Sequence, residues 1–539
     1  MAEILVNRGI DTPEQAYSFL CPSLKNLTDP FCIKDMDKAV NRIWTAIKNH
    51  EKILIFGDFD ADGVTSTSIL NDFFSFIDAE VSWYVPHRTK EGYSLKKEHI
   101  TMAVDQKIDL IITVDCGSDS NEAVAAAQKE DIDVIITDHH ELPEKTPEAL
   151  AIINPKRKDC TSGLTHLAGV GIAFYLVIAL RKHFREKGFW EEKQEPNLMQ
   201  YCDLVAIGTI ADMVPLKQEN RILSCAGINI MKKGARPGLR ALSQVSRVEL
   251  AHLDSDDISF RIAPRINAAG RIAHARICVN LLCTNDRVTA EQTAATLDGL
   301  NRKRQETEQS IIEDIEKKIY KNPELINKPA IIMCDKSWVP GVLGIAASKT
   351  AKKYFKPVIL ISTGSSPAVG SCRSIENINL YHALTECAFL LEKFGGHFMA
   401  AGLSIKNENI KKFSKAFEKK IAKIISKNDF KKKLYLDSTL DPCEITEDLI
   451  NEVDMLRPFG TDNPEPVFYC SDLKVQSSVL IGTKHRKMIL EKSGYTVEAM
   501  QFNIENPETP AYLEKIAFKL RINRFGKKSS PQIIIIEEQ

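Results

Sequence analysis

Features that would mark a secreted, zinc-ribbon or membrane-spanning protein are missing from this 539-residue sequence. Its thirteen cysteines are odd in number and include no C-x-x-C pair, which argues against a disulfide framework or a zinc ribbon and predicts reduced thiols. No apolar run reaches the length of about 18 residues that a membrane helix needs. The first residues, "MAEILVNRGIDTPEQAYSFL", contain no basic leader followed by an apolar core. We therefore expect a cytoplasmic protein that does not bind a membrane.

An excess of either charge is also missing, because 71 lysines and arginines nearly balance 72 aspartates and glutamates. The net charge of -1 excludes a chain that is basic throughout. A groove for nucleic acid needs only local positive charge, so composition leaves the partner open. The length and the hydrophobic content of 44% exceed what one core usually organises and predict about three or four domains.

Three short β-branched runs in the first half of the chain have the length and composition of strands. They occupy residues 52–56, 110–114 and 133–137, and the segments between them read as helices. This alternation predicts right-handed βαβ crossovers and a parallel sheet, with a ligand site beyond the carboxyl ends of the strands. Each run ends in an acidic loop.

The first acidic loop, "FGDFDADGVTST", places Asp58, Asp60 and Asp62 at alternate positions. Gly63 follows and can take a positive φ in a tight turn. Carboxylates this close raise one another's pKa unless a cation neutralises them. The alternatives are a solvated turn and half of an EF-hand loop, but Ile69 stands where an EF-hand needs a bidentate glutamate.

Three further elements add candidate ligands. Asp115 in "TVDCGS" follows the second run, and "ITDHHE" brings Asp138, His139 and His140 after the third. Asp212 lies in the apolar "LVAIGTIADMVPL" and needs a metal, a cation or an N-cap role there. Mixed oxygen and imidazole donors suit Mn²⁺, with Mg²⁺ as the other candidate. Together the loops predict a two-metal site for phosphate-ester chemistry.

Composition divides the chain into five predicted parts. Residues 46–285 hold the acidic loops, and residues 1–45 are expected to pack on them. Residues 286–325 read as a long charged connecting helix, and a second α/β pattern occupies residues 326–428. Residues 429–539 read as mostly β.

The order of four motifs resembles the DHH phosphoesterase superfamily: D-x-D-x-D-G, the Asp of "TVDCG", D-H-H and the Asp of "ADMVP". Over nearly the whole chain, "APRINAAGRI", "GVLGIAASK", "FGGHFMAAG" and "RPFGTDNPEPVF" resemble the bacterial RecJ exonucleases. This resemblance implies a parallel-sheet DHH catalytic domain, a DHHA1-type α/β domain and a C-terminal OB-like barrel. It also implies a monomeric 5′ to 3′ exonuclease of single-stranded DNA that acts in repair and recombination, releases 5′ mononucleotides and needs two Mn²⁺ or Mg²⁺ ions. A single-strand binding protein and a RecQ-type helicase are the partners it suggests.

The resemblance implies roles for individual residues. Asp58 is a further candidate metal ligand, Asp138 is expected to support an imidazole, and Phe56 replaces a histidine that small-substrate members use, so one ion should bind more weakly. The expected metal ligands are Asp60, Asp62, Asp115, His139 and Asp212. The expected catalytic residues are Asp115, which bridges the ions, and His139, His140 and His397. The expected substrate-binding residues are Arg88, Asn267, Arg271, Arg373, Ser374, Gly395, Gly396 and His397.

Structural roles compete with several of these assignments. Buried salt bridges would equally explain Arg265 and Arg271, an ordinary surface turn would explain Arg373, and Tyr93 could support a base or the fold. The lysine-rich residues 406–433 read mainly as the solvated face of an amphipathic helix rather than as a DNA patch. The core stripe of that helix consists of Ile410, Phe413, Phe417, Ile421 and Ile424. Charge for a strand in the barrel is expected from Lys484, His485, Arg486 and Lys487.

Two other functions stay open. A phosphodiesterase for short oligonucleotides or cyclic dinucleotides would not need the added β domain, and a non-catalytic repair scaffold would not need the complete set of acidic residues. Val339 and Asp462 depart from the family pattern, which commonly has histidine and glycine there, without touching an expected ligand.

Overall fold

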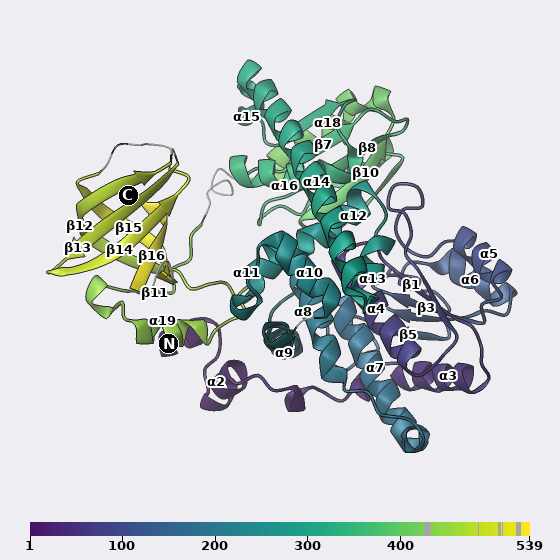
Figure 1. The fold of residues 1–539 in the computed structure, drawn as a ribbon. Coiled ribbons are helices and arrows are strands. Elements are labelled where there is room, and N and C mark those ends of the chain that lie inside the picture. Colours follow the sequence, from purple (N-terminus) through teal and green to yellow (C-terminus); the bar gives the residue numbers. More distant parts are fainter. Residues whose placement is uncertain are drawn as a thin grey trace.

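A five-stranded parallel sheet organises the first half of the chain and confirms the predicted α/β catalytic domain (Figure 1). The structure is a computed structural model that describes residues 1–234, 236–424, 433–482, 484–504, 508, 510–523 and 530–538. The strand order is β2-β1-β3-β4-β5. The strands are β1 (Ile53–Gly57), β2 (Val81–Tyr84), β3 (Leu110–Val114), β4 (Asp133–Thr137) and β5 (Ala151–Ile153).

Helices cover both faces of this sheet, because alternate strand residues point to opposite sides. Ile53 and Ile55 of β1 pack in one apolar cluster with α3, α4 and α7, whereas Leu54 and Phe56 pack in another with α5 and α6. Burial on both faces explains why the strands are apolar throughout. The bounds are α3 (Met36–Lys48), α4 (Ala61–Phe76), α5 (Lys97–Asp105), α6 (Asn121–Lys129) and α7 (Gly169–Glu186).

A helical layer follows the sheet and leads into the long connecting helix α14, which spans Arg287–Lys321. α14 contacts α10 and α12 in the first lobe and α16 in the second, so this single helix joins the two lobes. The remaining elements of the layer are α8 (Cys202–Ala211), α9 (Gln218–Gly234), α10 (Pro237–Ser246), α11 (Ser255–Asp257), a π-helical turn (Ile258–Ile262), α12 (Ala263–Ile272) and α13 (Arg276–Cys283). The short helix α15 (Glu324–Asn327) follows α14 and packs with the second lobe.

The second lobe is a smaller α/β domain around a sheet of order β6-β7-β8-β10-β9. Four core positions predicted for α18 are buried, but Ile424 is 46% exposed because it is the last residue of the helix. Residues 425–432 of the lysine-rich stretch lie outside the described residues. The elements are β6 (Ile331–Asp335), α16 (Pro340–Tyr354), β7 (Val358–Ser362), β8 (Ala368–Arg373), α17 (Leu380–Thr385), β9 (Lys393–Gly396), β10 (Ala400–Ile405) and α18 (Ile410–Ile424).

The C-terminal lobe is a closed β-barrel, as predicted, because β12 pairs with both β13 and β15. The elements are β11 (Ser438–Thr439), α19 (Glu447–Asp454), β12 (Phe468–Ile481), β13 (His485–Lys492), β14 (Tyr495–Phe502), β15 (Tyr512–Asn523) and β16 (Ser530–Glu538).

The N-terminal segment is shared between two lobes, which corrects the prediction that all of residues 1–45 pack on the catalytic domain. Ile4 and Leu5 of α1 (Ala2–Asn7) belong to the apolar core of the barrel, and Phe19 of α2 (Pro13–Leu20) packs against it. Only the later part, including Met36, joins the catalytic core. The apolar residues of this segment bury themselves on the nearest open core, which sequence distance does not reveal.

Arg221 of α9 fastens the barrel to the catalytic lobe. Its buried guanidinium donates to the carbonyl oxygens of Phe19 at 2.8 Å, Leu456 at 2.8 Å and Met455 at 3.1 Å. It also stacks over the Phe19 ring, with 3.9 Å between Cζ and the ring centroid. One side chain therefore joins α2, α9 and the end of α19.

We expect Arg221→Ala to weaken the attachment of the barrel by about 3 kcal/mol, because three buried carbonyls lose a charged donor. Lys217→Ala is the matched control, since Lys217 pairs with Asp462 at 3.0 Å on a half-exposed surface and such pairs contribute less than about 1 kcal/mol. Urea unfolding followed by circular dichroism measures both. Equal midpoints for the two variants would contradict the role of Arg221.

The structure explains one of the two departures from the family pattern, at Asp462, but not the other, at Val339. Asp462 has a φ of 58°, in the region that glycine favours and aspartate tolerates, and its carboxylate is held by Lys217. Val339 caps the start of α16, which does not explain its departure.

Candidate metal centre

The acidic loops meet beyond the carboxyl edge of the parallel sheet, where the sequence places them. Three sets of side chains bring their ligand atoms within 4.8 Å of one another. Asp115 belongs to two of the sets, and His139 belongs to two. The sets are Asp115, His139 and His140; Asp62, His139 and Asp212; and Asp58, Asp60 and Asp115.

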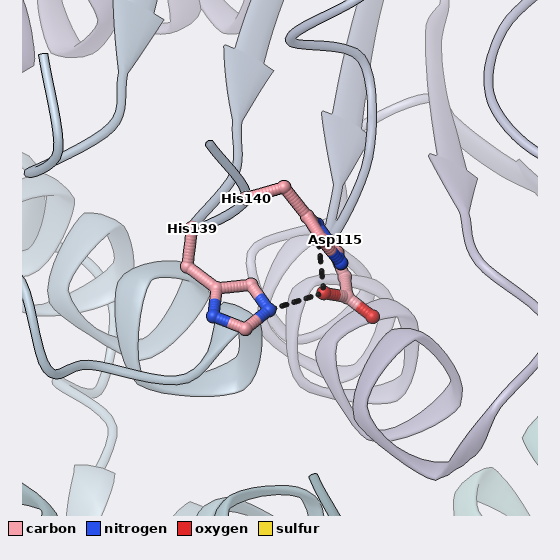
Figure 2. A group of neighbouring side chains, drawn as sticks. All are labelled: Asp115, His139 and His140. Carbon is pink, nitrogen blue, oxygen red and sulfur yellow. Dashed lines mark ion pairs between the residues drawn. The ribbon is translucent and has the colours of Figure 1, made fainter. Parts of the chain in front are cut away.

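His139 and His140 converge on Asp115, as Figure 2 shows. His139 Nε2 lies 3.2 Å from Asp115 Oδ1, 3.6 Å from Asp212 Oδ2 and 3.8 Å from Asp62 Oδ2. His139 Nε2, Asp115 Oδ1 and Asp58 Oδ1 are buried without a hydrogen-bond partner. Buried polar atoms are rarely left so, and oxygen and imidazole donors aimed at one space fit a divalent cation such as Mn²⁺ or Mg²⁺.

Local backbone structure holds the first acidic loop in place. The Asp60 side chain caps α4 by accepting from the backbone N–H groups of Asp62 at 3.0 Å and Gly63 at 3.1 Å. A Cβ at position 63 would lie 2.5 Å from the carbonyl oxygen of Asp58. Gly63 is therefore required by close packing in the first turn of α4, and the expected positive φ is not found there.

The N-terminus of α7 supports two of the carboxylates. The N–H groups of Gly169 and Val170 each donate to the Asp62 carboxylate at 2.8 Å. A Cβ on Gly169 would lie 2.6 Å from Asp115 Oδ1, so glycine is needed for this approach. Asp115 itself has a φ of 60°, a strained conformation that commonly accompanies functional sites.

Asp138 supports the histidine pair, as expected, and does not face the cation site. Its Oδ1 accepts from the backbone N–H groups of His139 at 2.7 Å and His140 at 3.1 Å, and lies 2.8 Å from His140 Nδ1. Burial lowers the pKa of His140, but the bond to Asp138 and the charges of Asp138, Asp212 and Asp58 together raise that pKa to about 9. Burial lowers the pKa of His139 to about 3, which leaves a neutral imidazole able to bind metal.

The carboxylates are costly to ionise together without a cation. Burial and the charge of Asp60 raise the pKa of Asp62 to about 7. Burial and the charges of Asp62 and Asp60 raise the pKa of Asp115 well above its usual value. Burial and the charges of Asp62 and Asp60 raise the pKa of Asp212 to about 9. A divalent cation would relieve this repulsion.

In the absence of metal, we expect the stability of the catalytic lobe to fall as the pH rises from about 4 to about 9. Folded Asp62 and Asp212 keep protons that the unfolded chain has already released in this window. Raising the pH removes those protons and favours unfolding. Thermal unfolding in EDTA should show a midpoint higher by about 5 °C at about pH 5.5 than at about pH 8.5. Saturating Mg²⁺ should remove the difference, and a midpoint that rises with pH would contradict the expectation.

Three arginines lie together beside the acidic loops without an acidic partner. Arg88, Arg271 and Arg373 form no ion pair within 4.0 Å in the described part of the chain. Burial and the neighbouring charges of Arg88 and Arg373 lower the pKa of Arg271 to about 10. Arg373 is oriented by Ser348 Oγ at 3.0 Å and Ser371 Oγ at 3.2 Å. Guanidinium groups arranged in this way fit a phosphate.

The glycine and histidine segment belongs to the second lobe and brings His397 near the histidine pair. A Cβ on Gly396 would lie 2.3 Å from the carbonyl oxygen of Ala400, so the turn between β9 and β10 requires glycine. Gly395 is exposed in the same strand. Burial and the nearby charge of His140 lower the pKa of His397, which places these two imidazoles near each other.

Several residues expected to contact the substrate have partners within the chain. The buried hydroxyl of Ser374 donates to Ile378 O at 2.7 Å and holds its own turn, and its contact with phosphate stays a prediction. Asn267 Oδ1 accepts from the N–H of Ala61 at 2.9 Å, so this side chain positions the acidic loop. Arg265 forms a salt bridge with Asp298 at 2.8 Å.

One aromatic and one basic side chain also have partners within the chain. Tyr93 Oη lies 3.2 Å from His140 Nδ1, which favours the structural one of its two predicted roles. Arg486 was expected to offer charge to a strand, but it is buried and donates to Gln501 Oε1 and to the carbonyl of Glu508. Whether a side chain of a barrel strand points inward or outward depends on the register of the strand, which composition does not reveal.

Two functional candidates went unnoticed in the sequence, in "INPK" after β5. Asn154 Nδ2 donates to His140 O at 2.9 Å and to Ser118 Oγ at 3.1 Å, so it fixes the histidine loop. Lys156 pairs with Glu141 at 3.1 Å, and its charge lowers the pKa of His139. The signal was present, because residues at the end of a further parallel strand reach the same edge.

Known proteins resemble the chain along its full length. The DHH family N-terminal domain matches residues 52–209, the DHHA1 domain matches 327–423, and the RecJ OB domain matches 436–537. The single-stranded-DNA-specific exonuclease RecJ of Haemophilus influenzae is 36% identical, over 95% of this chain and 92% of the relative. RecJ of Bacillus subtilis is 34% identical, over 99% of this chain and 67% of the relative.

Two solved structures with the same fold are complexes with divalent cations. RecJ from Thermus thermophilus in complex with Mn²⁺ matches with a TM-score of 0.85 at 26% identity, covering 100% of this chain and 75% of that chain. The corresponding complex with Mg²⁺ has a TM-score of 0.78 at the same identity, covering 100% and 74%. With the three domains in the same order and relatives above 30% identity over nearly the whole chain, this protein belongs to the RecJ family of single-stranded-DNA-specific exonucleases.

Proposed function

We propose that this chain is a metal-dependent exonuclease that degrades single-stranded DNA from the 5′ end and releases 5′ mononucleotides. The observation that carries the proposal is the adjacency of two groups of side chains. Acidic residues and histidines with orphaned buried donors form the metal centre, and three arginines without acidic partners lie beside it. One group suits cations and the other suits a terminal phosphate.

The arginine cluster explains the polarity that we propose. The guanidinium of Arg88 lies over the ring of Phe59 in the acidic loop, with 4.8 Å between Cζ and the ring centroid, and burial lowers the pKa of Arg271 while the charge of Asp60 raises it, so both arginines lie beside this loop. A strand whose 5′ phosphate is held by these guanidiniums would present its first internucleotide phosphate to the metal centre. A 3′ end carries no terminal phosphate to anchor in the same way.

Two ions held by Asp60, Asp62, Asp115, His139 and Asp212 would supply an activated water and neutralise charge on the phosphate. The side chains of this chain perform the positioning. The backbone N–H groups in the first turn of α7 hold the Asp62 carboxylate in place.

Two histidines can place protons and positive charge around the phosphate. His140, kept protonated by Asp138, can donate to a non-bridging oxygen. His397 approaches from the second lobe. The charge that develops on phosphorus is therefore met by one histidine from each lobe.

A comparison of substrates tests the proposal. With Mn²⁺, we expect the protein to digest a long 5′-phosphorylated strand with a higher kcat/KM than a 5-mer, and to leave a blunt duplex and a cyclic dinucleotide intact. A preference for the 5-mer or the cyclic dinucleotide would favour the small-substrate phosphodiesterase. Binding of the long strand without cleavage would favour the repair scaffold.

We further propose that the protein acts in the cytoplasm as a monomer during repair and recombination, with a single-strand binding protein and a RecQ-type helicase as partners. Its thirteen cysteines are all free, which supports a reducing compartment. None of the described helices is long and apolar enough to cross a membrane.

A further inference from the structure

A groove of about 430 Å³ lies between the catalytic lobe and the barrel. Its walls come from the end of α8 and the loop after it, the π-helical turn, α12, residues 459–465 and β15. Figure 1 shows α11 at the edge of the helical layer that is nearest the barrel. The groove is separate from the arginine cluster, which lies against the second lobe.

Two large apolar side chains stand exposed in this groove. Phe260 is 75% exposed and Met213 is 73% exposed. Neither has an ordinary backbone: Phe260 belongs to the π-helical turn, and Met213 has a φ of 60°. π-Turns and strained non-glycine residues are retained mainly where function requires them. Leaving both apolar side chains exposed costs stability, and a ligand that covers them would offset this cost.

One end of the groove adjoins the segments that carry and position the metal centre. Met213 directly follows Asp212, and Asn267 lines the groove while its side chain holds Ala61 in the acidic loop. The far end is formed by Phe459 and Lys519, at the base of the barrel. A strand with its first internucleotide phosphate at the metal centre has this groove as a direct continuation toward the third lobe.

Charge in the groove is balanced, which suits bases rather than phosphates. Glu465 is paired with Lys519 at 3.0 Å and also with Arg521. Asp256 lies 3.9 Å from Arg521. The two acids therefore do not repel a strand, and the apolar surface of Phe260 and Met213 is the main feature that a ligand meets.

We propose that Phe260 and Met213 form a stacking surface for the bases on the 3′ side of the scissile bond, as the strand passes from the barrel to the metal centre. The inference rests on the proposed function, because it takes single-stranded DNA as the occupant. Continuity with the metal centre at one end and with the barrel at the other selects that occupant. Stacking on an aromatic side chain is independent of sequence, as an exonuclease needs.

Steady-state kinetics on a long single strand test the surface first. Phe260→Ala should raise KM about tenfold, the effect of losing one stacked base, while kcat stays within about twofold. Phe260→Trp should restore KM because it restores a stacking face. Phe389→Ala is the control, since Phe389 is 79% exposed on the second lobe, outside the groove, and its loss should change nothing.

Strands with a single abasic nucleotide then identify the contact. Binding is measured by fluorescence anisotropy in Mg²⁺ with Asp115→Asn as the background, so that the strand is not cut. An abasic site at one or two positions near the 5′ end should weaken binding about tenfold with Phe260 present and have no further effect in Phe260→Ala. Additive effects at every position would overturn the stacking surface.

Two other results distinguish a failure of the stacking surface from a failure of the proposed exonuclease function. If the wild type cuts single strands normally and Phe260→Ala does so with the same KM, the stacking surface is wrong and the exonuclease stands. If the wild type neither binds nor cuts single strands, the proposed function itself fails. A change in oligomeric state by light scattering in Phe260→Ala, with unchanged strand binding, would assign the groove to a second copy of the chain and overturn the inference.

Discussion

Replacing Asp115 with asparagine is expected to lower kcat by about a thousandfold or more and, at the same time, to stabilise the metal-free protein. Asp115 is shared by two of the three sets of ligand atoms, so the loss of its charge weakens both halves of the centre. The same loss removes repulsion among buried carboxylates, which is what raises their pKa values in the folded protein. Activity and metal-free stability should therefore change in opposite directions.

Asparagine isolates the charge from the backbone. Asp115 has a φ of 60°, a region that asparagine tolerates and alanine does not. The matched control is Asp119→Asn, which removes an exposed carboxylate from the same loop that contacts Ser94 rather than the centre. That variant should keep wild-type kcat.

Thermal unfolding with and without Mn²⁺ supplies a readout that does not depend on catalysis. Wild type should gain about 2.7 kcal/mol when free Mn²⁺ exceeds its Kd a hundredfold. Asp115→Asn should gain much less at the same concentration, while starting from a higher midpoint in EDTA. Wild-type kcat in the variant would contradict the ligand assignment, and an unchanged midpoint in EDTA would contradict the proposed repulsion.

Arg373→Gln is expected to lower kcat/KM for a 5′-phosphorylated strand about a hundredfold, the loss of a charge-assisted bidentate contact. The same variant should act on a 5′-hydroxyl strand nearly as wild type does, because that substrate lacks the terminal phosphate. Arg373→Lys should recover only part of the loss, since an ammonium keeps the charge but not the planar fork held by Ser348 and Ser371.

The control for this prediction is Arg287→Gln, which removes an exposed arginine paired with Glu291 at the start of α14. Measured kcat/KM for both substrates, in all variants, gives the result. An equal loss on the two substrates would place Arg373 at another phosphate, and no loss on either would remove it from the binding site.

The metal centre could be predicted from sequence because one geometric rule places it. Parallel strands end at the same edge, so acidic residues that follow each apolar run converge there even though they are far apart in the chain. Asp58, Asp115 and His139 meet in this way, and the apolar setting of Asp212 marked it as a buried charge that needed a partner.

Side-chain direction could not be predicted in the same way, because it depends on local packing. Ser374 turns into its own loop, and Arg486 turns into the barrel, although both stand in polar stretches. Asn154 was missed because β5 has only three residues, too few to show a strand pattern. Ile4 and Leu5 join the core of a lobe that begins more than four hundred residues later, a pairing that no local pattern encodes.

The direction of digestion tests the central claim most directly. Two identical single strands are prepared, one blocked at the 5′ end by a bulky group and the other blocked at the 3′ end, and both are incubated with the protein and Mn²⁺. The account predicts that the 3′-blocked strand is degraded to 5′ mononucleotides and that the 5′-blocked strand stays intact. Degradation of the 5′-blocked strand alone, or of neither strand, would contradict it.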